Sequence, residues 1–220
     1  MDQFAEQVAG IGALVEPARR ALYLYVAAQP GAVSREQAAQ ALDLPVHSAK
    51  FHLDRLVAQG LLEVEYRRLS GRAGPGAGRP SKLYRRASAE VSVSLPERRY
   101  DLAGEVLAGA VELSMRSGAP IADAVREVAG EQGRRMAVGR HDLVDALGEH
   151  GYEPRADDGE ICLVNCPFDR LASRHVELVC GMNLALVEGV IDGLGIEGVE
   201  AALAPRPGYC CVRVRDARRD

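Results

Sequence analysis

Residues 47–60 have the sequence HSAKFHLDRLVAQG, and this segment determines the class of the first third of the chain. Leu53 and Leu56 are three residues apart, a helical spacing that places both on one inward face. Gly60 suits the position just after the end of a helix. The segment therefore predicts a helix with one buried face and one exposed, mostly polar face.

Two more helices are expected before it. Residues 16–29 carry Pro17 near the first turn, which is a favoured place for proline in a helix. Ser34 is a good helix cap, and Gln37 three residues later can complete a capping box. A four-residue turn at 43–46 then leads into the helix of residues 47–59. A helix, a short turn and a second helix form the layout of a helix-turn-helix motif.

A hairpin is expected directly after this motif. Residues 61–68 alternate like a strand, and residues 82–86 suit the returning strand. Residues 70–80 between them contain too many Gly and Pro residues for regular structure. The pattern predicts a winged helix-turn-helix domain over residues 1–87.

The local charge favours a polyanionic partner for this domain. The whole chain has a net charge of -4, but residues 45–86 contain 9 Lys or Arg against 3 Asp or Glu. A clustered excess of positive charge is typical of a nucleic-acid-binding surface. The alternative is an ordinary solvated surface on a small helical domain.

The sequence of residues 33–62, closed by GRPSKLY at 78–84, resembles the winged-helix domain of ArsR-type bacterial repressors. The resemblance covers residues 15–87 and implies a homodimer that binds a double-stranded DNA operator, more as a repressor than as an activator. A helix fits the major groove, and cations of the wing contact phosphates or the minor groove. The candidate DNA contacts are His47, Ser48, Lys50, Phe51, His52 and Arg55 in the helix, and Arg68, Arg72, Arg79 and Lys82 in the wing.

The middle of the chain predicts a linker over residues 88–100 and then two helices. Residues 100–117 and 121–138 have apolar residues at helical spacing. These helices form either a dimer interface, because a repressor that binds two half-sites needs a symmetric partner, or the core of a second domain. Residues 101–220 are predicted to be a dimerisation and cysteine-based sensor domain.

All five cysteines lie in this second domain, in the last 59 residues. This distribution is not that of a disulfide scaffold and suggests metal or thiol chemistry. A strand over residues 160–165 is expected to end at Cys166, and one long helix over residues 168–194 is expected to carry Cys180.

The last segment predicts a strand. Residues 208–215 alternate strictly, so Cys210 is expected on the inward face and Cys211 on the outward face. Cysteines therefore occupy a strand end, a helix interior and an inward strand position.

The sequences NCPF, ELVC and CCVRV around Cys166, Cys180 and Cys210 resemble the cysteine motifs of the SufR-like branch of these regulators. The resemblance covers residues 100–216 and implies that the three cysteines hold an iron–sulfur cluster, 4Fe-4S or 2Fe-2S, whose occupancy switches DNA binding. The extra Cys162, the vicinal Cys211 and the shortened tail depart from the motif. The fourth ligand therefore stays open among Cys162, His175 and Cys211.

Other interpretations of the cysteines stay open as well. Three cysteines with a further Cys or His can bind zinc or another thiophilic metal ion. A metal-free thiol switch would need a cysteine with a lowered pKa. The cysteines can also be structural, in a domain that binds a small molecule or is an enzyme attached to a DNA-binding domain. No catalytic residues are predicted, since we find no partnered nucleophile, carboxylate pair or phosphate-binding loop, and the chain is expected not to be an enzyme.

The sequence as a whole predicts an α+β fold with an N-terminal winged helix-turn-helix domain and a C-terminal α+β domain that contains the cysteines. A chain of 220 residues is long enough for two small domains. No apolar run approaches the roughly 18 residues that a membrane span needs, and the chain has Asp2 and Glu6 near its start instead of a basic and apolar leader. A cytoplasmic protein without a membrane partner is expected.

Overall fold

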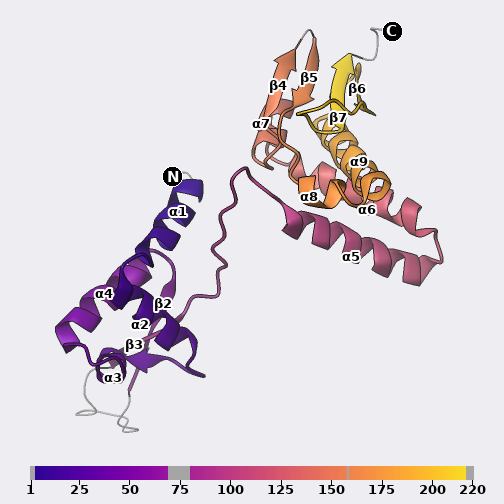
Figure 1. Ribbon diagram of the computed structural model, residues 1–220. Coiled ribbons are helices and arrows are strands. Elements are labelled where there is room, and N and C mark those ends of the chain that lie inside the picture. Colours follow the sequence, from indigo (N-terminus) through magenta and orange to yellow (C-terminus); the bar gives the residue numbers. More distant parts are fainter. Residues whose placement is uncertain (1–2, 69–79, 158, 217–220) are drawn as a thin grey trace. The chain divides into compact units, whose positions relative to one another are not determined.

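The computed structural model describes residues 3–68, 80–157 and 159–216, and the chain divides into two compact units, Met1–Val93 and Ser94–Asp220 (Figure 1). Both units contain helices and strands. Each unit has its own hydrophobic core.

The first unit is a small helical domain with a three-stranded sheet. The sheet order is β1-β3-β2, with antiparallel pairs throughout. Its described elements in chain order are α1 (Gln3–Ala13), α2 (Pro17–Ala27), β1 (Val33–Ser34), α3 (Arg35–Ala41), α4 (Val46–Ala58), β2 (Leu62–Arg67) and β3 (Ser81–Arg86).

The helices predicted in this unit are present, with their ends shifted by one or two residues from the predicted ones. Ser34 accepts a hydrogen bond from the Gln37 amide, and the Gln37 side chain accepts one from the Ser34 amide, which completes the capping box at the start of α3. Gly60 follows α4 with a φ of 71°, a conformation that favours glycine. Leu53 and Leu56 of α4 are fully buried. The helix-turn-helix with a following hairpin is therefore present as the sequence predicts.

Helix α1 was not expected from the sequence. Phe4, Val8 and Ile11 follow a helical spacing, but each is 44–45% exposed, and Gly10 and Gly12 weaken the helical pattern. The helix contributes little to the core of the first unit, which explains why its pattern is weak.

The second unit places helices against a four-stranded antiparallel sheet of order β4-β5-β7-β6. Its described elements are α5 (Tyr100–Ser117), α6 (Ile121–Met136), α7 (Leu143–Gly148), β4 (Pro154–Asp157), β5 (Glu160–Leu163), α8 (Asp169–Ala172), α9 (Val176–Leu194), β6 (Val199–Leu203) and β7 (Val212–Asp216).

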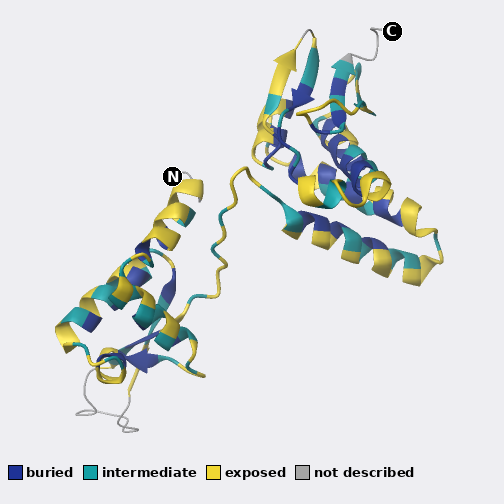
Figure 2. Cartoon of the chain, in the orientation of Figure 1, coloured by how far each residue is buried: buried dark blue, intermediate teal, exposed yellow. Residues whose placement is uncertain are grey.

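Helix α9 is the central element of this unit. It contacts β6 and β7 of the sheet as well as α6, and α6 in turn contacts α5. Figure 2 shows α9 largely buried, which fits a helix that is apolar on most of its surface. The elements of the second unit are therefore arranged around α9.

The prediction of one helix over residues 168–194 is wrong. The chain forms the short α8 and then α9, with a break at His175, whose φ of -134° and ψ of 56° are not helical. Phe168, the residue directly before α8, is fully buried, and its ring packs edge-on against Tyr152 at a centroid distance of 6.4 Å. Strands β4 and β6, at the two edges of the sheet, were also not expected.

Residues 88–99 of the predicted linker have no regular structure, whereas its last residue, Tyr100, already begins α5. The two halves of the segment lie with different units. Val91 packs on the core of the first unit. Arg99 donates its backbone N–H to the carbonyl of Pro167 at 3.1 Å, within the second unit. Residues 94–99, which we call the anchor segment, are thus held by the second unit.

The two helices after the linker contribute to the core of the second unit. Leu102 and Val106 of α5 and Val125 and Ala129 of α6 are buried in it. On the outer side of α5, Met115 is 82% exposed. This arrangement agrees with the second of the two alternatives from the sequence, and it leaves the role of α5 and α6 in a dimer as a prediction.

Glycines allow α6 and α9 to approach until their backbones touch. A Cβ atom added at Gly133 of α6 would overlap the carbonyl oxygen of Leu186, and one added at Gly189 of α9 would overlap the carbonyl oxygen of Gly130. Neither clash can be relieved by a side-chain rotation, because the opposing atoms belong to the backbone. The spacing of the two helices therefore depends on these glycines.

We expect Gly133→Ala to lower the free energy of unfolding of the second unit by about 2 kcal/mol, because the added methyl group forces the two helices apart. The matched control is Gly181→Ala in α9, where a Cβ meets nothing within 4 Å. That change should be neutral or stabilising by about 0.5 kcal/mol, as alanine favours helix. Thermal unfolding followed by circular dichroism compares the variants, and equal melting temperatures for both would contradict the close contact.

Candidate functional site

Helix α4 presents one polar face to solvent. Ala49, Leu53 and Leu56 are fully buried on its inner side, which fixes the direction of the other residues. Among the predicted contacts, the exposed ones are His47, Lys50, Phe51 and Arg55, while Ser48 is half-buried. Phe51 is 65% exposed, an unusual position for a large aromatic side chain.

His52 departs from its expected place on the exposed face. Its side chain is 16% exposed, and its Nδ1 lies 3.5 Å from Oε2 of Glu16. Glu16 caps α2 by accepting hydrogen bonds from the amides of Ala18 and Arg19, at 3.1 and 2.7 Å. His52 therefore packs against the start of α2, and its expected role in contacting DNA needs a change of side-chain conformation.

Lys82 also differs from its expected role as a free cation of the wing. Its Nζ lies 2.5 Å from Oδ1 of Asp54 on α4, and the same oxygen accepts a hydrogen bond from the hydroxyl of Tyr84 at 2.8 Å. Burial alone would raise the pKa of the Asp54 carboxyl, but the hydrogen bonds from Lys82 and Tyr84 outweigh it and lower that pKa. Lys82 thus attaches β3 to α4.

The remaining wing residues divide into two groups. Arg68 is exposed at the end of β2. Arg72 and Arg79 lie outside the described residues. The geometry therefore presents Lys50, Arg55 and Arg68 as exposed cations of the predicted surface.

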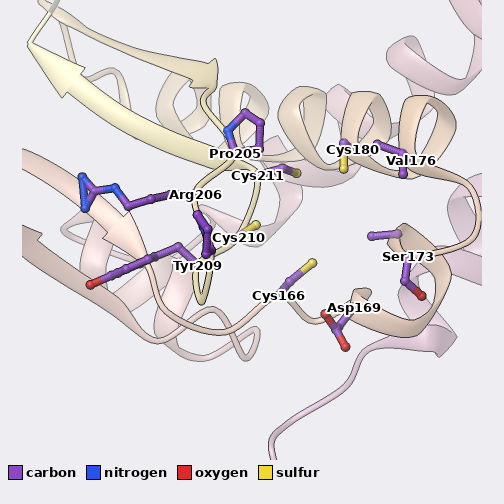
Figure 3. A pocket seen from close by; sticks show the side chains of 12 residues that line it. Cys166, Asp169, Ser173, Val176, Cys180, Pro205, Arg206, Tyr209, Cys210 and Cys211 are labelled. Carbon is purple, nitrogen blue, oxygen red and sulfur yellow. The ribbon is translucent and has the colours of Figure 1, made fainter.

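Four of the five cysteines line one pocket of the second unit (Figure 3). The pocket has a volume of about 450 Å³ and opens to solvent. Cys166 follows β5, Cys180 lies on α9, and Cys210 and Cys211 directly precede β7. In Figure 3 the four sulfur atoms face the same hollow. We call this group the cysteine pocket; its other lining residues are Asp169, Ala172, Ser173, Val176, Pro205, Arg206, Pro207 and Tyr209.

The expected outward orientation of Cys211 is wrong. Strand β7 begins only at Val212, so the strand alternation does not extend back to Cys210 and Cys211. Both residues line the cysteine pocket. The two other candidates for a fourth ligand do not line it: Cys162 is buried within β5, and His175 is exposed at the start of α9.

The thiols of the cysteine pocket are hydrogen-bonded in series. The pKa of Cys166 is lowered mainly because the Cys210 thiol donates a hydrogen bond to the Cys166 sulfur. A hydrogen bond from the backbone N–H of Phe168 also lowers this pKa. That same bond to Cys166 raises the pKa of Cys210 to about 12. Burial and a bond to Cys211 raise the pKa of Cys180 to about 12. The pKa of Cys211 is raised by its bond to Cys210 and by burial.

Two buried side chains, Tyr152 and Asn183, are hydrogen-bonded to each other, and Asn183 contacts the sulfur atoms of the cysteine pocket. The Tyr152 hydroxyl donates to Oδ1 of Asn183 at 2.6 Å, and Nδ2 of Asn183 lies 3.1 Å from the Cys210 sulfur and 3.9 Å from the Cys211 sulfur. Because Tyr152 occupies the amide oxygen, the amide N–H groups of Asn183 are directed at sulfur. Sequence reasoning did not assign a role to this pair, although Asn183 lies three residues after Cys180 on α9.

Within residues 3–68, 80–157 and 159–216, no three or more His, Cys, Asp or Glu side chains are grouped closely enough to hold a single metal ion. In the same part of the chain, no helix has the length and apolar character needed to cross a membrane.

Comparison with known proteins supports a function for the first unit only. Residues 14–65 match the family model of a helix-turn-helix domain. No curated protein and no solved structure matches the chain. The match and the geometry of α3 and α4 define a helix-turn-helix domain and support a DNA-binding transcription regulator, a class that is generally not enzymatic.

In reduced, metal-free protein we expect iodoacetamide to alkylate Cys166 before the other cysteines of the pocket, because the thiolate is the nucleophile and only Cys166 among them has a lowered pKa. Its rate should rise at a lower pH than that of an unperturbed thiol. Peptide mapping by mass spectrometry measures the order of labelling, with Cys162→Ser as the control outside the pocket. Earlier labelling of Cys180 or Cys210 would contradict the assigned hydrogen bonds.

Proposed function

We propose that the chain is a transcription repressor of the SufR-like branch of ArsR-type regulators. It binds its DNA operator as a homodimer, and an iron–sulfur cluster held in the cysteine pocket controls the binding. Cys166, Cys180 and Cys210 would hold the cluster, with Cys211 as the fourth ligand. The proposal includes no catalytic activity.

One observation carries this proposal: three segments that are distant in the sequence bring four thiols to one pocket. Cys166, Cys180 and Cys211 lie on a loop, a helix and the approach to a strand. Buried cysteines that serve only as small apolar residues have no reason to face one solvent-open hollow. Thiolates are the usual ligands of iron–sulfur clusters.

The chemistry of the pocket fits such a group. Without a cation, the shared hydrogen bonds and burial keep Cys180, Cys210 and Cys211 protonated at neutral pH, since their pKa values are raised. Four thiolates in this space need positive charge to offset their repulsion, and iron supplies it. The Asn183 N–H groups would then stabilise the charge on sulfur. A bound cluster would supply a group that is sensitive to oxidants and to iron supply.

For the DNA-binding part, we propose that α4 enters the major groove with His47 and Phe51 toward the bases, while Lys50, Arg55 and Arg68 contact the phosphate backbone. Two copies would bind two half-sites, and the state of the cysteine pocket would favour one arrangement of the two copies.

A specific observation favours a second candidate, a thiol switch without metal. Cys166 has a lowered pKa and a hydrogen-bonded partner in Cys210. A peroxide would oxidise the Cys166 thiolate to a sulfenic acid with release of hydroxide. The Cys210 thiol would then displace water to form a disulfide, so that two electrons pass to the peroxide.

Metal analysis of anaerobically purified protein tests the proposal. We expect iron with acid-labile sulfide and a broad absorbance near about 400 nm, and we expect Cys166→Ser, Cys180→Ser and Cys210→Ser each to lose most of the iron. Cys211→Ser should lower the iron content or make the cluster labile. The matched controls are Cys162→Ser and His175→Ala, which should keep the iron.

Other results of this measurement would select among the alternatives. Zinc without acid-labile sulfide would show that the pocket holds a zinc ion instead of an iron–sulfur cluster. Absence of any metal, together with a Cys166–Cys210 disulfide after peroxide treatment, would support the thiol switch. Iron retained in all four variants would refute the assigned ligands.

DNA binding through α4 predicts a measurable salt effect. Lys50→Ala and Arg55→Ala should each weaken binding to duplex DNA and reduce the slope of log K against log salt by about one for each phosphate that the variant no longer neutralises. Arg155→Ala in β4 of the second unit, outside the two helices predicted for dimerisation, is the control that removes the same charge. Fluorescence anisotropy at several salt concentrations measures the slopes, and a slope unchanged in both α4 variants would place the DNA-binding surface elsewhere.

A further inference from the structure

The anchor segment, residues 94–99, is hydrogen-bonded to the loop that carries Cys166. The guanidinium of Arg98 donates from Nη1 to the carbonyl of Cys166 at 2.8 Å and to Oδ1 of Asn165. Asn165 returns a hydrogen bond from Nδ2 to the carbonyl of Glu97 at 2.9 Å. The Arg99 amide adds a bond to Pro167.

These bonds lie in a protected environment. Asn165 is 6% exposed, and the Arg98 side chain is 19% exposed, with Asp169 at 4.0 Å from its Nη2. The Asn165 amide also donates to the carbonyl of Gly151 at 2.6 Å, which fixes its side chain from the other side. Hydrogen bonds to charged or buried partners cost more to lose than exposed ones.

These bonds join the loop of Cys166 to the first residues of the second unit. Cys166 follows Asn165 directly, so a displacement of the Cys166 backbone moves both acceptors of Arg98. The anchor segment contains the first residues of the second unit after Val93, and α5 begins at Tyr100 directly after it. The loop of Cys166 therefore holds the part of the chain through which the first unit is connected to the second.

We infer that Arg98 and Asn165 couple the state of Cys166 to the DNA-binding unit by holding or releasing the anchor segment. This inference rests on the proposed function and names the residues that transmit its signal. Release would free six residues, 94–99, which span roughly 20 Å when extended. A longer and more mobile connection lowers the effective concentration of one DNA-binding unit at the second half-site once the other is bound.

The first experiment compares DNA affinity in two states of the cysteine pocket, as isolated anaerobically and after removal of metal by a chelator under oxidising conditions. We expect the wild-type affinities to differ by about five-fold or more. In Arg98→Ala the ratio should fall below about two-fold while the iron and sulfide content stays at the wild-type level. The control is Arg99→Ala, which keeps the backbone bond to Pro167 and should keep the wild-type ratio.

If Arg98→Ala does not fold, Arg98→Lys serves as the second variant. Lysine keeps the charge but lacks the planar guanidinium, so it should hold the anchor segment less well. A purely structural role of Arg98 would change both affinities equally and preserve the ratio. A wild-type ratio in an Arg98 variant that keeps its iron would overturn the inference.

Hydrogen exchange separates this inference from the proposed function. Alkylation of Cys166 with N-ethylmaleimide in metal-free wild-type protein should speed exchange of the amides of residues 97–99 by about ten-fold or more. In Arg98→Ala these amides should exchange fast before and after alkylation. Unchanged exchange in alkylated wild type would refute the coupling even if the protein binds a cluster, and fast exchange would support it even if no cluster is found.

Discussion

Direct contact between the backbones of α6 and α9 is the constraint on which the second unit depends. Gly133 and Gly189 leave no room for a Cβ atom, so the two helices are held at a fixed spacing. Helix α9 also contacts the sheet and carries Cys180 and Asn183. One wall of the cysteine pocket is therefore rigid, whereas Cys166, Cys210 and Cys211 lie on segments between regular elements. A change in the pocket would be expected to move those segments and not the helix.

Much of the first unit could be predicted from local sequence patterns. Ser34 with Gln37, the spacing of Leu53 and Leu56, and Gly60 are signals that act within a few residues, and the structure confirms each of them. The roles of His52 and Lys82 were not predictable in this way. Their partners Glu16 and Asp54 lie 36 and 28 residues away in the sequence.

In the second unit, more of the important contacts join residues that are distant in the sequence, so less of it could be predicted. The pattern of residues 208–215 predicts alternation, but it does not show that the regular strand β7 begins only at Val212. Tyr152 and Asn183 are 31 residues apart, and nothing in the sequence indicates that their hydrogen bond directs an amide at Cys210. The cysteine motifs indicate which residues to consider, while the fold places Cys211, and not Cys162 or His175, in the lining of the pocket with the other three cysteines.

Phe51 limits which features of the proposed DNA operator helix α4 can recognise. A phenylalanine ring offers neither donor nor acceptor, so in the major groove it can recognise only the methyl group of thymine or the shape of a base step. With 65% of the residue exposed in the free protein, DNA binding would remove apolar surface from water. Its contribution would appear as a negative heat-capacity change on binding, a quantity that is largely independent of the salt concentration that governs the contacts of Lys50 and Arg55.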